Sequence, residues 1–169
     1  LDANTTAHYN NGIGTHAWSS NTTGTNNTAV GYEAGKNNTT AVELTAVGSQ
    51  ALYTNTTGVK NNAFGYKALY ANTTGGENTA LGCHTLMANT TGSYNCAVGH
   101  NSLFKNVTTS KSTAVGTEAL RNTTTGCDNT IIGHGTTGQC SSFCNQILIG
   151  CGVTGAGSNQ TVIGNGNTT

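Results

Sequence analysis

Residues 61–77 read NNAFGYKALYANTTGGE, and residues 78–94 read NTALGCHTLMANTTGSY. The two segments align without a gap and share a glycine and an Asn-Thr-Thr-Gly run at matching positions. The same glycine, here named the solenoid glycine, recurs at one constant interval as Gly14, Gly31, Gly48, Gly65, Gly82, Gly99, Gly116, Gly133 and Gly150. A unit this short cannot enclose a core of its own, so neighbouring units must bury one another's apolar side chains.

The residues around each solenoid glycine predict strands rather than helices. The triplet Thr28-Ala29-Val30 suits a strand, and the glycine that follows suits a corner. The Asn-Thr-Thr-Gly run predicts a second corner, and units so rich in Gly, Asn and Thr would make poor helices. We therefore expect an all-β parallel β-solenoid (β-roll) whose 17-residue coils stack in register.

Two columns of large apolar residues are candidates for the core. The first precedes the solenoid glycines, and we expect it to form one internal column of Val30, Val47, Phe64, Leu81, Val98 and Val115. The second lies four positions after the glycine and comprises Trp18, Leu52, Leu69, Leu86, Leu103 and Leu120, with Gly35 interrupting it. If Phe64 is enclosed, Phe64→Ala should cost roughly 3–5 kcal/mol.

Small residues accompany these columns and bear on assembly. They are Ala29, Ala46, Ala63, Ala80, Ala97 and Ala114, and in a second column Ala34, Ala51, Ala68 and Ala119. A narrow coil has little interior, and alanines permit close approach between chains. We expect the chain to form a homotrimer through them.

The repeat changes toward the end of the chain. Residues 1–133 are expected to form the regular solenoid, and residues 134–169 a Cys-rich transition to a narrower terminal coil of the same solenoid. The next equivalent glycine after Gly150 is Gly164, which makes the last unit a 14-residue coil. The chain starts at Leu1 without a signal peptide, so we expect it to be a piece of a larger or processed protein.

Composition argues against several functions. Six Lys and Arg balance six Asp and Glu, so no basic patch indicates nucleic acid as a partner. No apolar run approaches the roughly 20 residues of a membrane span. The acidic residues Asp2, Glu33, Glu43, Glu77, Glu118 and Asp128 form no catalytic motif. We expect a non-enzymatic protein without membrane insertion.

The sequence blocks themselves resemble a known family. NTAVGYEAG, NNAFGYKALYANTTG and STAVGTEALRNTTTG are similar to repeats of bacteriophage tail fibres. The closing NQILIGCGVTGAGSNQTVIGNGNTT resembles the segment that precedes the C-terminal chaperone domain of such fibres, and its 14-residue coil also resembles the head repeat of trimeric autotransporter adhesins. The resemblance implies a homotrimer of β-rolls that attaches to a host surface. We expect a stiff fibre segment located in a virion tail fibre or at a cell surface, with a host glycan or protein as partner. The alternatives are a bacterial surface adhesin or polymerising extracellular filament, and thirdly an ice-binding solenoid.

The histidines do not predict a metal site. His100 and His134 share a column but lie two coils apart, or roughly 10 Å, which is too far for one metal ion within a chain. We expect neither a metal nor another cofactor. Cys127 and Cys144, by contrast, lie one coil apart in one column. They should sit side by side, within reach of a disulfide.

Asparagines and tyrosines supply the remaining candidates. Asn21, Asn38, Asn55, Asn72, Asn89 and Asn106 recur seven positions after the glycine. They could stack as a hydrogen-bonded ladder or serve as Asn-Thr-Thr glycosylation sites. Adjacent threonines should point to opposite faces, which argues against an ice-binding surface built from these pairs. Tyr32, Tyr53, Tyr66 and Tyr70 could stack on sugars or pack between chains.

Overall fold

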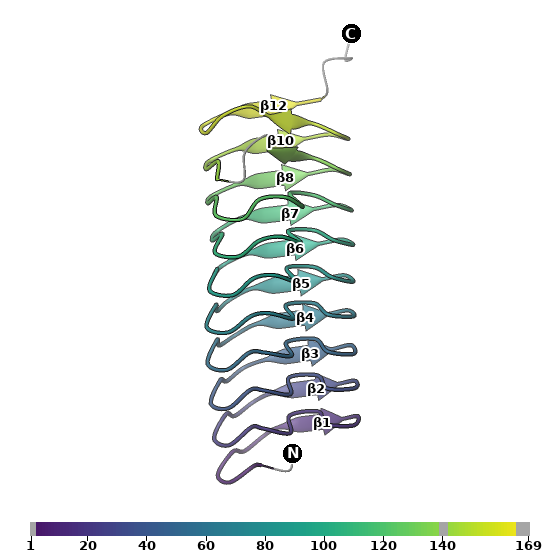
Figure 1. Ribbon diagram of the computed structural model, residues 1–169, viewed down its shortest axis with the longest axis vertical. Helices are drawn as coiled ribbons and strands as arrows, with labels where there is room; N and C mark the ends of the chain where they lie inside the picture. The colour runs from purple at the N-terminus through teal and green to yellow at the C-terminus, as the bar shows by residue number, and fades with distance from the viewer. Residues whose placement is uncertain (1–2, 139–141, 165–169) are drawn as a thin grey trace.

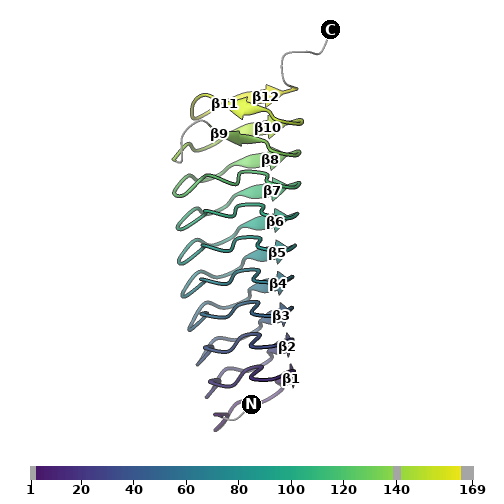
Figure 2. The same ribbon diagram turned by 45° about the vertical axis from the view of Figure 1, so that its right-hand side comes forward.

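The computed structural model describes residues 3–138 and 142–164 as a rod of stacked coils (Figure 1). The strands are β1 (Asn11–Ile13), β2 (Thr28–Val30), β3 (Thr45–Val47), β4 (Asn62–Phe64), β5 (Thr79–Leu81), β6 (Cys96–Val98), β7 (Thr113–Val115), β8 (Thr130–Ile132), β9 (Thr137–Gly138), β10 (Ile147–Ile149), β11 (Thr154–Gly155) and β12 (Thr161–Ile163). One parallel sheet of ten strands runs β1 to β8, then β10 and β12. The strands β9 and β11 pair separately in the last coils (Figure 2).

The observed register confirms the predicted parallel β-solenoid. Ala46 pairs with Ala63 and Ala63 with Ala80, so paired residues are separated by the interval of the solenoid glycines. That interval holds as far as the pairing of Thr130 with Ile147, and it becomes shorter in the final pairing of Ile147 with Thr161. In the ranges 3–138 and 142–164 no helix occurs, and hence none that is long and apolar enough to cross a membrane.

The prediction that the column before the solenoid glycines is internal is wrong. Phe64, Leu81 and Val115 are 39%, 48% and 36% exposed, and Val30, Val47 and Val98 are only half-buried. These residues do stack in register, but their side chains point outward. The middle residue of each strand points inward instead, and Ala63 is fully buried. Successive strand residues face opposite sides, so enclosing the alanine exposes the larger residue after it.

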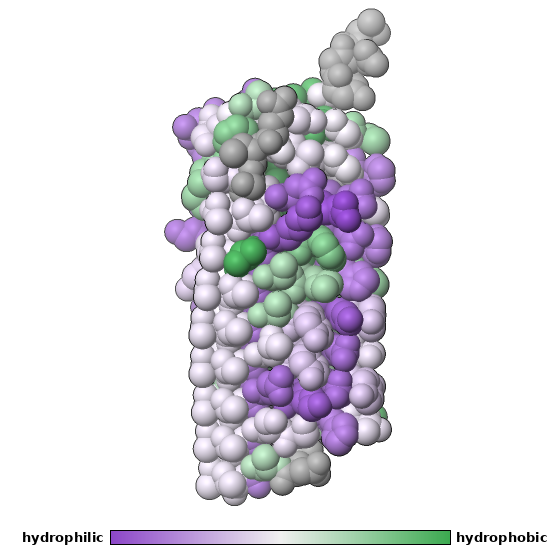
Figure 3. Space-filling view, in the orientation of Figure 1, coloured by the Kyte–Doolittle hydropathy of each residue, from purple (hydrophilic) through white to green (hydrophobic). Residues whose placement is uncertain are grey.

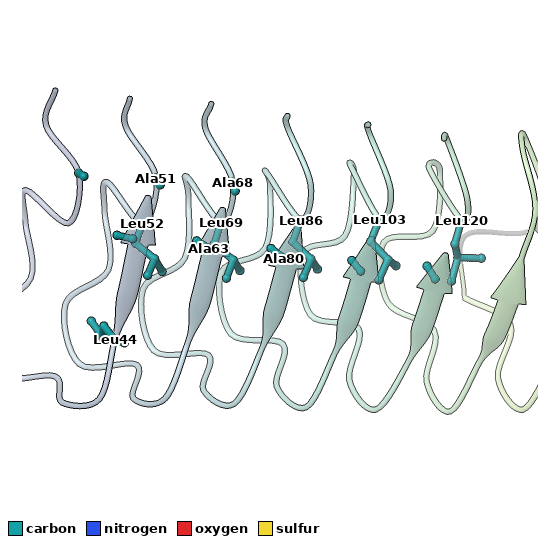
Figure 4. Close-up of a cluster of buried hydrophobic side chains, with 14 of the residues drawn as sticks. Leu44, Ala51, Leu52, Ala63, Ala68, Leu69, Ala80, Leu86, Leu103 and Leu120 are labelled. Atoms are coloured by element: carbon teal, nitrogen blue, oxygen red, sulfur yellow. The ribbon is translucent and has the colours of Figure 1, made fainter. Parts of the chain in front are cut away.

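The interior is narrow, and this explains why alanine faces it. The large residues four positions after the glycine are fully buried against the strand alanines, as Leu69 is near Ala63 in Figure 4. Where that leucine column ends after Leu120, the strand residues become Ile131 and Leu148, which are also fully buried. The core therefore accepts one large and one small residue per coil, and the large one can come from either wall.

The predicted role of the alanine columns in contacts between chains is also wrong. Both columns are completely enclosed within the coil, Ala29 and Ala114 in the strands and Ala34 and Ala119 on the neighbouring wall. They permit close approach of two walls of one chain, and they offer no surface to another chain.

The solenoid glycines are needed for conformation and for space. Gly65 has φ +136°, and a Cβ added there would lie 2.5 Å from the carbonyl oxygen of Gly82 in the next coil. Coils thus contact backbone to backbone at this corner, which fixes the spacing along the rod.

The corrected core changes the expected effects of two substitutions. Leu69→Ala should cost about 2–5 kcal/mol, because Leu69 is fully enclosed. Phe64→Ala should cost one chain only about 1–2 kcal/mol, because part of the ring is already in water. Urea unfolding of both variants at several protein concentrations checks this. If Phe64→Ala lost more free energy of unfolding than Leu69→Ala, and by the same amount at every protein concentration, the outward orientation of Phe64 would be contradicted.

Candidate functional site

One corner of the rod collects aromatic, histidine and cysteine side chains. These side chains lie one, two and five positions after the solenoid glycines, in the part of the chain from Tyr32 to Arg121. The surface that they form is here named the corner face. Backbone hydrogen bonds between coils hold it, such as His84 N–H to the Tyr66 carbonyl (2.9 Å) and Asn101 N–H to the Cys83 carbonyl (3.1 Å). The side chains therefore project from a regularly spaced frame.

Along the fifth positions, a run that contains three aromatic rings has one cation at each end. Tyr53 and Tyr70 stack with ring centroids 5.1 Å apart and planes at 8°. At one end, the Lys36 ammonium lies 5.6 Å from the Tyr53 ring, and at the other the Arg121 guanidinium lies 5.5 Å from the Phe104 ring. Such contacts are typical of cation–π pairs and hold the rings in place.

Of the four tyrosines expected either to stack on sugars or to pack between chains, the structure brings three together. The Lys67 ammonium lies 5.2 Å from the Tyr66 ring and 5.3 Å from the Tyr70 ring, and Tyr70 stacks on Tyr53. Tyr66 is 44% exposed and presents a face to solvent. Tyr32 is also exposed, and it takes no part in these ring contacts.

The carboxylates near this corner are engaged in ion pairs. Glu33 accepts a hydrogen bond from Lys36 at 2.7 Å and another from Gln50 at 2.9 Å. These two bonds, Lys36 foremost, lower the pKa of Glu33. Glu118 pairs with Arg121 of its own coil at 3.7 Å. Neither arrangement resembles a pair of catalytic carboxylates facing a common substrate.

The six predicted asparagines lie inside the solenoid. All are fully buried, so the folded coil presents none of their side chains for glycosylation. Asn72 Nδ2 donates to Asn55 Oδ1 (2.6 Å) and Asn89 Nδ2 donates to Asn72 Oδ1 (2.8 Å). The ladder begins at Asn21 and ends before Asn106, which uses its Oδ1 to accept the Thr109 N–H (2.8 Å). This column is structural.

The sequence analysis missed a second internal column of amides, comprising Asn27, Asn61, Asn78, Asn95 and Asn129. Asn78 Oδ1 accepts the Asn95 N–H of the next coil (3.0 Å), and Asn78 Nδ2 donates to the Gly92 carbonyl (2.9 Å). Recurrence thirteen positions after the glycine could have revealed it. Both columns satisfy backbone groups at the corners, where the strand ladder provides no partner.

The structure places Cys127 and Cys144 side by side, as free and half-buried thiols. Cys127 N–H donates to Cys144 Sγ at 3.0 Å. Hydrogen bonding to Cys144, followed by burial, raises the pKa of the Cys127 thiol to about 12. Such a thiol is a weak nucleophile, which fits a structural role. A disulfide between the two residues stays a prediction.

A second sulfur-containing cluster went unnoticed in the sequence. Cys83, His84 and His100 place one ligand atom each within 4.8 Å of one another. The sequence analysis compared histidines only with other histidines and therefore did not detect this cluster. The first position after the solenoid glycine holds Cys83 in one coil and His100 in the next.

Comparisons with protein-family models, with curated proteins and with solved structures find no match to this chain. The fold by itself defines the class, a parallel β-solenoid repeat protein. Membership of a tail-fibre or adhesin family stays a prediction from the sequence blocks.

Proposed function

We propose that this chain is a rigid segment of a trimeric attachment fibre, of the kind found in phage tail fibres and similar adhesins. One observation carries the proposal, an apolar stripe on the outer face of the long sheet. The stripe consists of the residues before the solenoid glycines and their equivalents in the last coils, namely Ile13, Val30, Val47, Phe64, Leu81, Val98, Val115, Ile132, Ile149 and Ile163.

The stripe is continuous and largely uncovered within one chain. Ile13, Leu81 and Ile132 are 66%, 48% and 42% exposed. Exposed apolar surface of this extent marks an interaction site, and a second copy of the rod matches its length and spacing. Three copies in parallel would close around one axis and cover all three stripes. The face in Figure 3, by contrast, carries separate hydrophobic patches near mid-length and toward the ends, and no continuous stripe.

The interior suits a stiff spacer. Each coil bonds to the next through strand pairs, asparagine amides and the hydroxyl of the first threonine of each pair, as in Thr73 Oγ1 to the Thr90 carbonyl (3.0 Å). Lateral assembly through the stripe leaves the corner face as a surface for contact with a host. Its tyrosines and Lys67 offer rings and a cation of the kind that contacts glycans.

Disrupting the stripe tests the assembly. Light scattering of the wild type at micromolar concentration should give three times the mass of one chain. Leu81→Glu should reduce the measured mass to that of a single chain, because the substitution places a charge in the apolar interface. Thr74→Glu, at an exposed corner threonine, is the matched control and should remain trimeric. A monomeric wild type, or a trimeric Leu81→Glu protein, would overturn the proposal.

A second candidate, ice binding, is favoured by one observation. Thr28, Thr45, Thr79 and Thr113 share one in-register column on the outer face, beside the apolar stripe, with Asn62 and Cys96 interrupting it. A flat array of threonine and β-branched residues could order water. Ice-crystal shaping by a monomeric protein would favour this candidate over the fibre.

A further inference from the structure

The cluster of Cys83, His84 and His100 combines residues of two adjacent coils. Cys83 and His84 follow Gly82, and His100 follows Gly99. Cys83 and His84 are half-buried and His100 is exposed, so solvent reaches the cluster from one side. Their ligand atoms lie within 4.8 Å of one another.

The backbone beneath the cluster is fixed by consecutive hydrogen bonds between coils. Gly99 N–H donates to the Leu81 carbonyl (2.8 Å) and Asn101 N–H donates to the Cys83 carbonyl (3.1 Å). A metal ion bound at about 2.0–2.3 Å needs ligand atoms somewhat closer together than 4.8 Å. The ligand atoms are already within 4.8 Å of one another, so binding requires only a short approach of these side chains.

The three ligand atoms are also available. In the ranges 3–138 and 142–164, none of the three side chains takes part in a hydrogen bond. The His84 ring is oriented by its contacts with Tyr66 (5.2 Å) and Phe104 (6.1 Å).

We propose that Cys83, His84 and His100 bind one zinc ion at the surface of the solenoid. One thiolate and two imidazoles form a ligand set that suits zinc, whereas Mg²⁺ and Ca²⁺ require oxygen ligands. On binding, the Cys83 thiol releases its proton to solvent and its sulfur forms the bond to the metal. The exposed side of the cluster leaves a fourth position for water or for a donor group of a ligand. The ion would also link two coils across the corner face.

Titration with Co²⁺, a spectroscopic substitute for zinc, tests the site in the full chain under metal-free, reducing conditions. We expect one Co²⁺ per chain, a thiolate-to-cobalt charge-transfer band, and loss of the band when Zn²⁺ is added. Cys83→Ser should abolish the band. His100→Gln changes an exposed side chain and should fold, but it should weaken binding at least about 100-fold, because even outer-shell changes cost about 10–100-fold.

Two control variants separate this cluster from the other thiols and histidines. Cys96→Ser removes a strand cysteine, and the double variant His134→Gln/Cys151→Ser removes a pair with Sγ and Nδ1 3.9 Å apart in adjacent coils. Both should bind Co²⁺ like the wild type. A missing band in the wild type, an unchanged band in Cys83→Ser, unweakened binding by folded His100→Gln, or loss of the band in either control would each overturn the proposal.

Discussion

Asn72→Leu is expected to lower the free energy of unfolding by about 2–4 kcal/mol, although the substitution adds apolar volume to a fully buried position. Asn72 Nδ2 donates to Asn55 Oδ1 (2.6 Å) and to the Gly75 carbonyl (2.9 Å), and its Oδ1 accepts from Asn89 (2.8 Å). Without Asn72, Asn55 Oδ1 loses its donor. The Gly75 carbonyl still accepts a hydrogen bond from Asn61 Nδ2, and Asn89 Nδ2 still donates to the Gly92 carbonyl. This limits the loss to one orphaned group and two weakened ones.

Asn72→Asp sharpens the test because it keeps the shape of the side chain. The introduced carboxylate cannot donate to Asn55 and places a buried charge beside two acceptors, so it should be more damaging than Asn72→Leu at neutral pH. Burial raises the pKa of that carboxyl in the folded state. The variant should therefore regain stability as the pH falls toward about 4, where protonation restores a donor.

Urea unfolding at one protein concentration measures both effects. Thr74→Val, at the exposed second threonine of the same corner, is the control and should change stability by no more than about 0.5 kcal/mol. If Asn72→Leu were as stable as this control, the buried amide column would contribute nothing to cohesion between coils.

The repeat in the sequence predicted the register because one spacing governs every column. A constant interval between glycines permits no other alignment, and the strand pairs follow it from Asn11 to Ile149. The position of Cys127 beside Cys144 followed from the same spacing. The sequence alone was therefore sufficient to predict which residues of successive coils lie beside one another.

The sequence did not predict in the same way which side chains of a strand point into the core. Strand β4 has three residues, and its Ala63 and Phe64 are both apolar, so alternation alone cannot decide which of the two is enclosed. Burying the larger residue is usually the better choice. Here the opposite wall already supplies Leu69, and the remaining space admits only a methyl group. The Cys83, His84 and His100 cluster escaped prediction for a related reason, because it combines two columns whose proximity depends on the path of the corner.

Trp18 and Gly35 show how the same space can be filled across two coils. Both occupy the position four residues after the solenoid glycine, where most coils have leucine. Trp18 is fully buried, and a Cβ added at Gly35 would coincide with its indole ring. The indole of one coil therefore fills the place of the missing side chain in the next. Gly35 has φ +60° and Leu52 has φ +51°, so the backbone at Gly35 would accept leucine if the indole were absent.

A double-mutant cycle at these positions should show strong compensation. Gly35→Leu should destabilise by about 3 kcal/mol or more through overpacking, and Trp18→Leu by about 2–4 kcal/mol through the cavity it leaves. The double variant restores a leucine in both coils and removes the buried Trp18 Nε1–H, which has no hydrogen-bond partner in the described residues. The stability of the double variant should match that of the wild type within about 1 kcal/mol, which implies a coupling energy well above the additivity error of about 0.5 kcal/mol.

If Gly35→Leu alone does not fold, recovery of the fold by adding Trp18→Leu is the readout. Additive losses in the double variant would mean that the two residues do not share one space, and that the core is not filled coil by coil.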